Sequence, residues 1–108
     1  MGAQLQMQLL KNEKDKYFLR LRLFSISKPG VISYYDIPNE NEFSFNRLLK
    51  PVMVAGGSLA EYQNEQYGDN FNPDDVAYVA SEALRDLLTQ LKDASPSDVQ
   101  EEYAINVH

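Results

Sequence analysis

The clearest pattern in the sequence is the segment KYFLRLRLFSIS, residues 16–27. Its side chains alternate in character with a period of two, which is typical of a β-strand whose two faces meet different surroundings. One face would be apolar and is formed by Tyr17, Leu19, Leu21 and Leu23. The other face would combine cations with aromatic rings and is formed by Lys16, Phe18, Arg20, Arg22 and Phe24.

The segments on either side of this strand also have the character of strands. Residues 4–11 alternate polar and apolar side chains, and residues 31–37 are rich in β-branched and aromatic residues. A polar cluster at 12–15 and the pair Pro29-Gly30 separate the three segments, and both are typical turn sequences. We therefore expect an antiparallel meander of three to four strands in the N-terminal half.

The second half of the chain predicts one long amphipathic helix near residues 73–93. Asn72 suits the N-cap, Pro73 the first helical position, and two aspartates follow where the helix dipole favours negative charge. Apolar residues recur at spacings of three and four, from Val76 to Leu91, and form one broad stripe. This stripe would pack on the sheet, which makes the fold class α+β.

The remaining segments give weaker patterns. Residues 42–70 are expected to be irregular or to hold a short helix, because Pro51 and the stretch Gly56-Gly57-Ser58 interrupt any periodicity. A short helix over 96–103 follows from a second capping pattern, and residues 104–108 would trail off or add an edge strand. Gly56-Gly57 lacks the lysine and register of a phosphate-binding loop, so it is interpreted as a turn.

Composition limits the classes of function. The chain has 108 residues, no cysteine and a single histidine, His108. We expect one domain over residues 1–108, with no thiolate chemistry, no cysteine-based metal site and no cofactor. No apolar run approaches the ~18–20 residues that span a bilayer, and residues 1–10 lack the pattern of a signal peptide. These features predict a cytoplasmic protein without membrane contact.

Charge divides the sequence into unlike halves. Residues 1–50 carry eight basic and five acidic residues, whereas residues 51–108 carry two basic and eleven acidic ones. Such asymmetry indicates a charged partner, pairing between subunits in a homo-oligomer, or neutralisation within one fold.

The first candidate site is a line of carboxylates on the predicted long helix. At 100° per residue, Asp75, Glu82, Asp86 and Asp93 fall within an arc of roughly 40°. A rigid row of this kind suits the basic surface of a partner protein, and it would speed association by electrostatic steering. Glu61, Glu65 and Tyr62 are predicted to assist it; the alternative is an ordinary solvated helix face.

The second candidate is the mixed face of the strand over 16–27. Phe18, Arg20, Arg22 and Phe24 would stack bases and track a phosphate backbone if the face were open. The alternative is that the rings are covered and the arginines pair with acids. Nucleic acid is the less favoured partner because such domains are usually basic, whereas this chain has a net charge of −6.

These observations predict a non-enzymatic, acidic protein-binding module. In size and charge it is analogous to immunity proteins against bacterial toxins and to phage-encoded inhibitors, although no motif identifies a family. Acidic residues such as Asp69, Asp74 and Asp75 do not have EF-hand spacing, so no metal site is expected. Binding of single-stranded nucleic acid is the alternative function.

Overall fold

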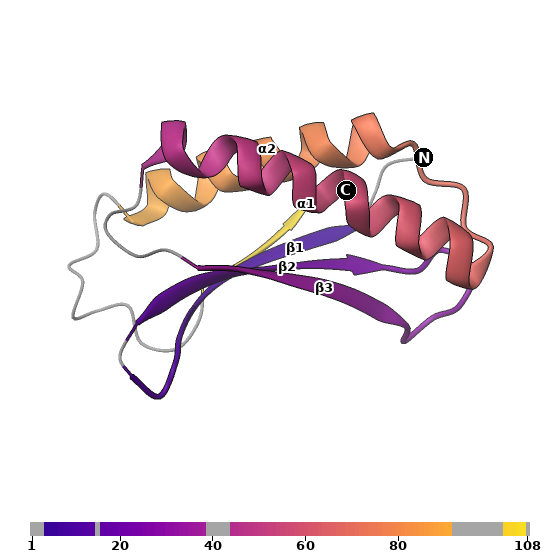
Figure 1. Cartoon of the computed structure of the whole chain (residues 1–108), viewed down its shortest axis with the longest axis horizontal. Helices are drawn as coiled ribbons and strands as arrows, with labels where there is room; N and C mark the ends of the chain where they lie inside the picture. The colour runs from indigo at the N-terminus through magenta and orange to yellow at the C-terminus, as the bar shows by residue number, and fades with distance from the viewer. Residues whose placement is uncertain (1–3, 15, 39–43, 92–102, 108) are drawn as a thin grey trace.

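The computed structural model describes residues 4–14, 16–38, 44–91 and 103–107 and has an α+β architecture. The elements, in chain order, are β1 (Leu5–Lys11), β2 (Tyr17–Phe24), β3 (Ile32–Pro38), α1 (Phe45–Tyr67), α2 (Pro73–Leu91) and β4 (Tyr103–Val107). The strands form one antiparallel sheet in the order β3-β2-β1-β4. Both helices lie on the same face of this sheet, and no described element covers the other face (Figure 1).

The predicted meander is confirmed, and its turns follow from the residues in them. Asn12 closes the β1–β2 turn, where its side-chain oxygen accepts hydrogen bonds from the N–H groups of Lys14 and Lys16. After β2, Gly30 takes a φ of 90° and the N–H of Val31 donates to the carbonyl of Lys28, as expected for a Pro-Gly turn. The predicted strand over 16–27 is too long: β2 ends at Phe24, because Ser25 and Ser27 hydrogen-bond into the turn.

The largest correction concerns residues 42–70. In place of irregular structure or a short helix, the chain forms α1, a helix of 23 residues. Pro51 lies in its second turn, on the exposed side, and Gly56 and Gly57 lie inside the helix and not in a turn. A Cβ at Gly56 would stand 3.1 Å from Cβ of Ala80, so α1 and α2 pack closely against each other at this glycine. Contact with α2 therefore overrides the low intrinsic helix propensity of these residues.

The predicted helix near 73–93 is confirmed over Pro73–Leu91. Asn72 caps it as expected, since its side-chain oxygen accepts a hydrogen bond of 2.9 Å from the N–H of Asp74. Residues 92 and 93 and most of the predicted helix over 96–103 lie outside the described residues. Tyr103, the last residue of that prediction, begins β4 instead, and β4 is the edge strand that was the alternative for the C-terminal end.

The core lies between the helices and the sheet. The sheet contributes alternate residues of β1 and β2, all at most 1% exposed: Leu5, Met7, Leu9, Leu19, Leu21 and Leu23. The helices contribute side chains at spacings of three and four, such as Leu48, Val52, Leu59, Val76, Ala80, Ala83, Leu84 and Leu87. Each large apolar side chain buried in this way contributes about 1.5–3 kcal/mol. Among the described residues, no helix combines the length and apolar character needed to cross a membrane.

Candidate partner-binding surfaces

The predicted acidic line lies on a free flank of α2. Its described members, Asp75, Glu82 and Asp86, are called the acidic row below; Asp75 and Asp86 are exposed and Glu82 is half-buried. Ala77 marks the side of α2 that contacts α1, because its Cα lies 3.3 Å from a Cβ built at Gly56. The row lies roughly 140–180° round the helix from Ala77, so it points away from α1.

The chain does not neutralise the acidic row from its own described side chains. No hydrogen bond or ion pair joins Asp75, Glu82 or Asp86 to a described cation. Arg20 and Arg22, the two arginines of β2, are engaged elsewhere. They alternate with core residues of the same strand, so they lie on the face of the sheet opposite the helices. Arg85 lies between Glu82 and Asp86 in the sequence, but its guanidinium lies over the ring of Phe45, 5.1 Å from the ring centre.

The structure places the three residues predicted to assist the row on the other helix, α1. Tyr62 lies on the flank of α1 that faces β3, and Glu61 and Glu65 are exposed on the same helix. Since α1 contacts β2 and β3 while α2 contacts β1 and β4, Tyr62 and the acidic row lie on opposite flanks of the helical layer. Asp93 lies outside the described residues.

The predicted mixed face of β2 is formed and faces away from the helices. Phe18, Arg20, Arg22 and Phe24 are all half-buried on it, and no described element lies over them. Tyr34 of β3 extends the face, as the register pairs it with Arg22, and it is 60% exposed. The alternative interpretation predicted that another element covers the rings, and in the described part of the chain none does.

The other part of that alternative holds for Arg20. Its guanidinium makes two hydrogen bonds to Asp36, of 2.7 and 2.9 Å, and lies 4.7 Å from the ring centre of Tyr34 and 5.5 Å from that of Phe18. The hydrogen bonds to Asp36 raise the pKa of Arg20 above its ordinary value, against an opposing effect of burial. Arg22 donates a longer hydrogen bond, 3.3 Å, to Gln6. Asp36 thus neutralises the charge of Arg20 within the sheet, whereas Arg22 bonds to a neutral amide.

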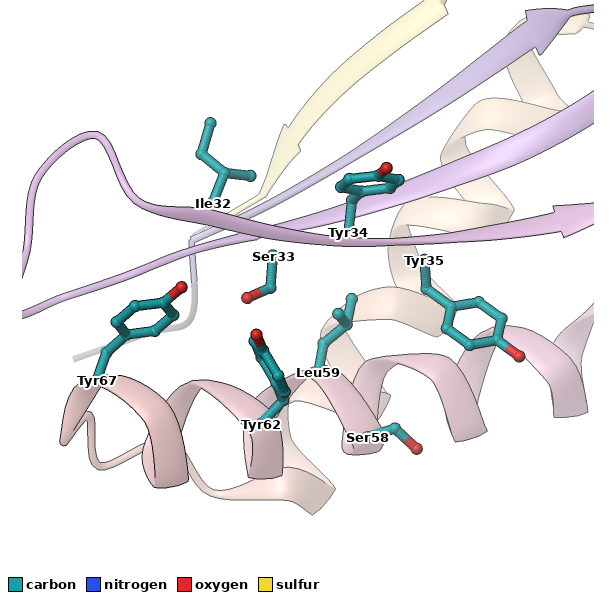
Figure 2. Close-up of a pocket in the computed structure, with 8 residues that line it drawn as sticks. All are labelled: Ile32, Ser33, Tyr34, Tyr35, Ser58, Leu59, Tyr62 and Tyr67. Atoms are coloured by element: carbon teal, nitrogen blue, oxygen red, sulfur yellow. The ribbon is translucent and has the colours of Figure 1, made fainter.

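A cavity of about 410 Å³ lies between β3 and α1, and sequence patterns did not indicate it. Figure 2 shows Tyr62 and Tyr67 on α1, with Ser33 and Tyr35 pointing towards that helix from β3. The rings of Tyr62 and Tyr67 meet edge to face with centres 6.3 Å apart. The sequence showed only that several tyrosines stand in polar stretches; their convergence depends on residues about 30 positions apart in the chain meeting in space.

Two buried oxygens without hydrogen-bond partners lie where α1 meets the sheet, and the first belongs to the wall of this cavity. Ser33 is 7% exposed and its hydroxyl makes no hydrogen bond. Gln63 is fully buried: its amide nitrogen donates a 2.8 Å hydrogen bond to the carbonyl of Leu23, while its amide oxygen has no partner. Leu23 is opposite Ser33 in the β2–β3 register, so both oxygens belong to the same contact between the sheet and α1.

Comparisons with known proteins identify no relative of this chain. The chain has no match among protein-family models, curated proteins or solved structures. In the described part of the chain, no group of three or more histidine, cysteine or acidic side chains is arranged to hold a metal ion.

Proposed function

We propose that this protein is a non-enzymatic, acidic binding module that neutralises a basic partner protein through the acidic row of α2. The observation that carries the proposal is the state of Asp75, Glu82 and Asp86: they share one flank of a helix, and no described cation pairs with them. Like charges so placed repel one another and destabilise an isolated helix by a few tenths of a kcal/mol. A basic partner would relieve that repulsion.

The scaffold suits this task because it holds the row rigidly. Val76, Ala80 and Leu87 of the same helix are completely buried, so α2 cannot roll on the sheet without exposing its core side chains. The three carboxylates are spaced by about 10 and 6 Å along the helix axis. A fixed row of charges at such spacing favours a surface with cations in matching positions, and it accelerates the encounter at low salt.

An inhibitory, cytoplasmic role belongs to the same proposal. The absence of cysteine is compatible with a reducing compartment, and the only histidine is residue 108, so catalysis would have to rely on carboxylates, lysines or tyrosines. Binding of single-stranded nucleic acid to the mixed face of β2 is the weaker alternative, because Asp36 already holds the guanidinium of Arg20.

The test is a double charge reversal, Glu82→Lys with Asp86→Lys. A matched control, Glu13→Lys with Gln4→Lys and Asn70→Lys, makes the same change in net charge at exposed positions outside the row and its assisting residues. Proteins captured from a lysate of the source cells by the wild type are identified by mass spectrometry, and their association rates are measured at two ionic strengths. We expect the reversal to lower the association rate at least about tenfold and to abolish its salt dependence, while the control stays near wild type.

A partner that binds the reversed variant at an unchanged rate would overturn the proposal. A parallel mobility-shift assay with labelled single-stranded oligonucleotides tests the alternative. Retardation that is lost in Phe18→Ala and weakens with salt would assign the function to the mixed face of β2 instead.

A further inference from the structure

Strand β3 is one edge of the sheet, and none of the described strands pairs with its outer side. The N–H of Ser25 donates to the carbonyl of Val31, which makes these two residues a hydrogen-bonded pair. Because such pairs alternate along an antiparallel ladder, Ser33, Tyr35 and Ile37 direct their main-chain groups to β2. The N–H and carbonyl groups of Ile32, Tyr34 and Asp36 therefore point outward.

These outward groups run along the cavity between β3 and α1. Ile32 and Tyr34 both belong to the cavity wall, yet in Figure 2 their side chains point away from α1. What they present to the cavity is therefore their main chain. Ser33 and Tyr35, the residues in alternation with them, point their side chains towards α1 in the same view. A row of free main-chain groups beside a cavity is the arrangement that accepts an added strand.

The cavity itself has the chemistry of a pocket for one apolar side chain. Its wall contains no charged residue, and four of its residues are tyrosines. Ser33 adds a hydroxyl that is more than nine-tenths buried and has no hydrogen-bond partner. A buried polar atom is rarely left unpaired in a native structure. A bound segment would supply the missing partner of this hydroxyl from its main chain or from the polar tip of an aromatic side chain.

The helix that forms one wall of the cavity carries charges that indicate the charge of that ligand. Glu61 and Glu65 are exposed on α1 on either side of Tyr62 in the sequence, and neither is paired with a described cation. At the edge of β3, Asp36 is paired with Arg20 and adds no free negative charge. Lysine or arginine in a bound segment would therefore meet uncompensated carboxylates along α1.

From these observations we propose that an extended segment of a partner protein adds to β3 as a further strand. An aromatic or branched apolar side chain of this segment fills the cavity, and basic residues flank it. The site goes beyond the proposed function, because it lies on the flank of the molecule opposite the acidic row and uses main-chain hydrogen bonds. Charge reversal of Glu82 and Asp86 should leave it intact.

The test selects ligands from a phage-displayed library of short random peptides against the full chain. Selected peptides are then titrated by fluorescence anisotropy against two variants of one residue, Tyr34→Pro and Tyr34→Ala. Both variants lose the ring, but only proline loses the outward N–H, and that N–H takes no part in the β2–β3 ladder. We expect binding to fall at least about tenfold in Tyr34→Pro relative to Tyr34→Ala.

A second pair of measurements localises the peptide. Ser58 is exposed on the cavity wall, so Ser58→Trp should block the pocket without disturbing the core. Hydrogen exchange of the Ile32, Tyr34 and Asp36 amides should slow when peptide binds. If Tyr34→Pro fails to fold, the test uses peptides instead. One peptide is methylated at the odd-numbered amide nitrogens and another at the even-numbered ones. Only the peptide whose methyl groups point away from β3 should still bind.

Three results would overturn the proposal. The first is that no peptide is enriched by the selection. The second is that enriched peptides bind Tyr34→Pro, Tyr34→Ala and Ser58→Trp equally well. The third is that the same three amides become protected with rising protein concentration while the molar mass doubles, because the strand added to β3 would then be a second copy of this chain.

Discussion

At the scale of single residues, the helical layer depends on the absence of a side chain at Gly56. A Cβ there would lie 3.1 Å from Cβ of Ala80 and 3.2 Å from the carbonyl oxygen of Val76. At Gly57 the nearest atom, the carbonyl oxygen of Pro73, would be 3.7 Å away, an ordinary contact. The two adjacent glycines thus have different roles. The close approach of α2 requires glycine at position 56 but not at position 57.

This difference predicts opposite effects of substitution. Gly56→Leu should lower the free energy of unfolding by about 2–3 kcal/mol, because the larger side chain forces α1 and α2 apart. Gly57→Ala should raise it by about 0.5–1 kcal/mol, since alanine restricts the unfolded chain and favours the helix. Urea unfolding followed by circular dichroism measures both. Equal changes in the free energy of unfolding for the two substitutions would show that the space at Gly56 does not determine how α1 packs on α2.

At the scale of elements, Asp69 joins two connections that are distant in the sequence. It lies between α1 and α2, is 8% exposed, and accepts a 2.9 Å hydrogen bond from the N–H of Ser27 in the β2–β3 turn. The hydroxyl of Ser27 donates to the carbonyl of Tyr67 beside it. Burial raises the pKa of Asp69, but hydrogen bonding to Ser27 and its neighbours outweighs this, so the net pKa lies below the usual value for aspartate.

A lowered pKa in the folded state has a definite sign in its effect on stability. The ionised form is favoured by folding, so the contribution is complete above the pKa of an unfolded aspartate and is lost as pH falls through the lower, folded value. Asp69→Asn should therefore reduce the free energy of unfolding at pH 7 by about 1–2 kcal/mol. The difference in free energy of unfolding between the variant and the wild type should become smaller in acid.

Thermal or urea unfolding at a series of pH values from neutral to about 2 tests this prediction. The same series on Asp74→Asn serves as the control, because Asp74 is exposed and takes part in no described ion pair. If the difference in free energy of unfolding between Asp69→Asn and wild type stays constant across the acid range, the ionised carboxylate does not hold the β2–β3 turn to the α1–α2 connection.

At the scale of the whole molecule, the ends of the described chain meet in the sheet. Strand β4 pairs with β1, with Leu5 opposite Val107 and Leu9 opposite Tyr103. The N–H of Phe24 donates to the carbonyl of Gln4, so alternate residues of β1 bond to β2. The main chain of Leu5, Met7 and Leu9 is left to bond with β4.

Removal of residues 103–108 would leave those groups without partners next to buried side chains. We expect the truncated chain to lose at least about 2 kcal/mol of stability and to self-associate, because β1 would become a long exposed edge. Urea unfolding and light scattering measure the two effects. A truncated chain that remains monomeric and as stable as the full chain would show that β4 adds little to the sheet.

Much of this architecture follows from local patterns. The alternation in residues 16–27 is sufficient to predict β2 and its two unlike faces, and Asn72 with Pro73 is sufficient to place the start of α2, because strand faces and helix caps depend on neighbouring residues alone. The acidic row is also a local feature, since the rotation per residue of a single helix aligns Asp75, Glu82 and Asp86.

Other features depend on contacts between distant segments. Pro51, Gly56 and Gly57 argue against a helix by intrinsic propensity, and the packing of α1 on α2 and on the sheet compensates for them. Tyr62 was predicted to assist the acidic row, but the crossing of α1 over β2 and β3 places it beside the cavity. The sequence alone therefore determined the strands, the caps and the charges on each face. Packing of the helices decided which faces meet, because close contact contributes several kcal/mol, more than the local preferences it overrides.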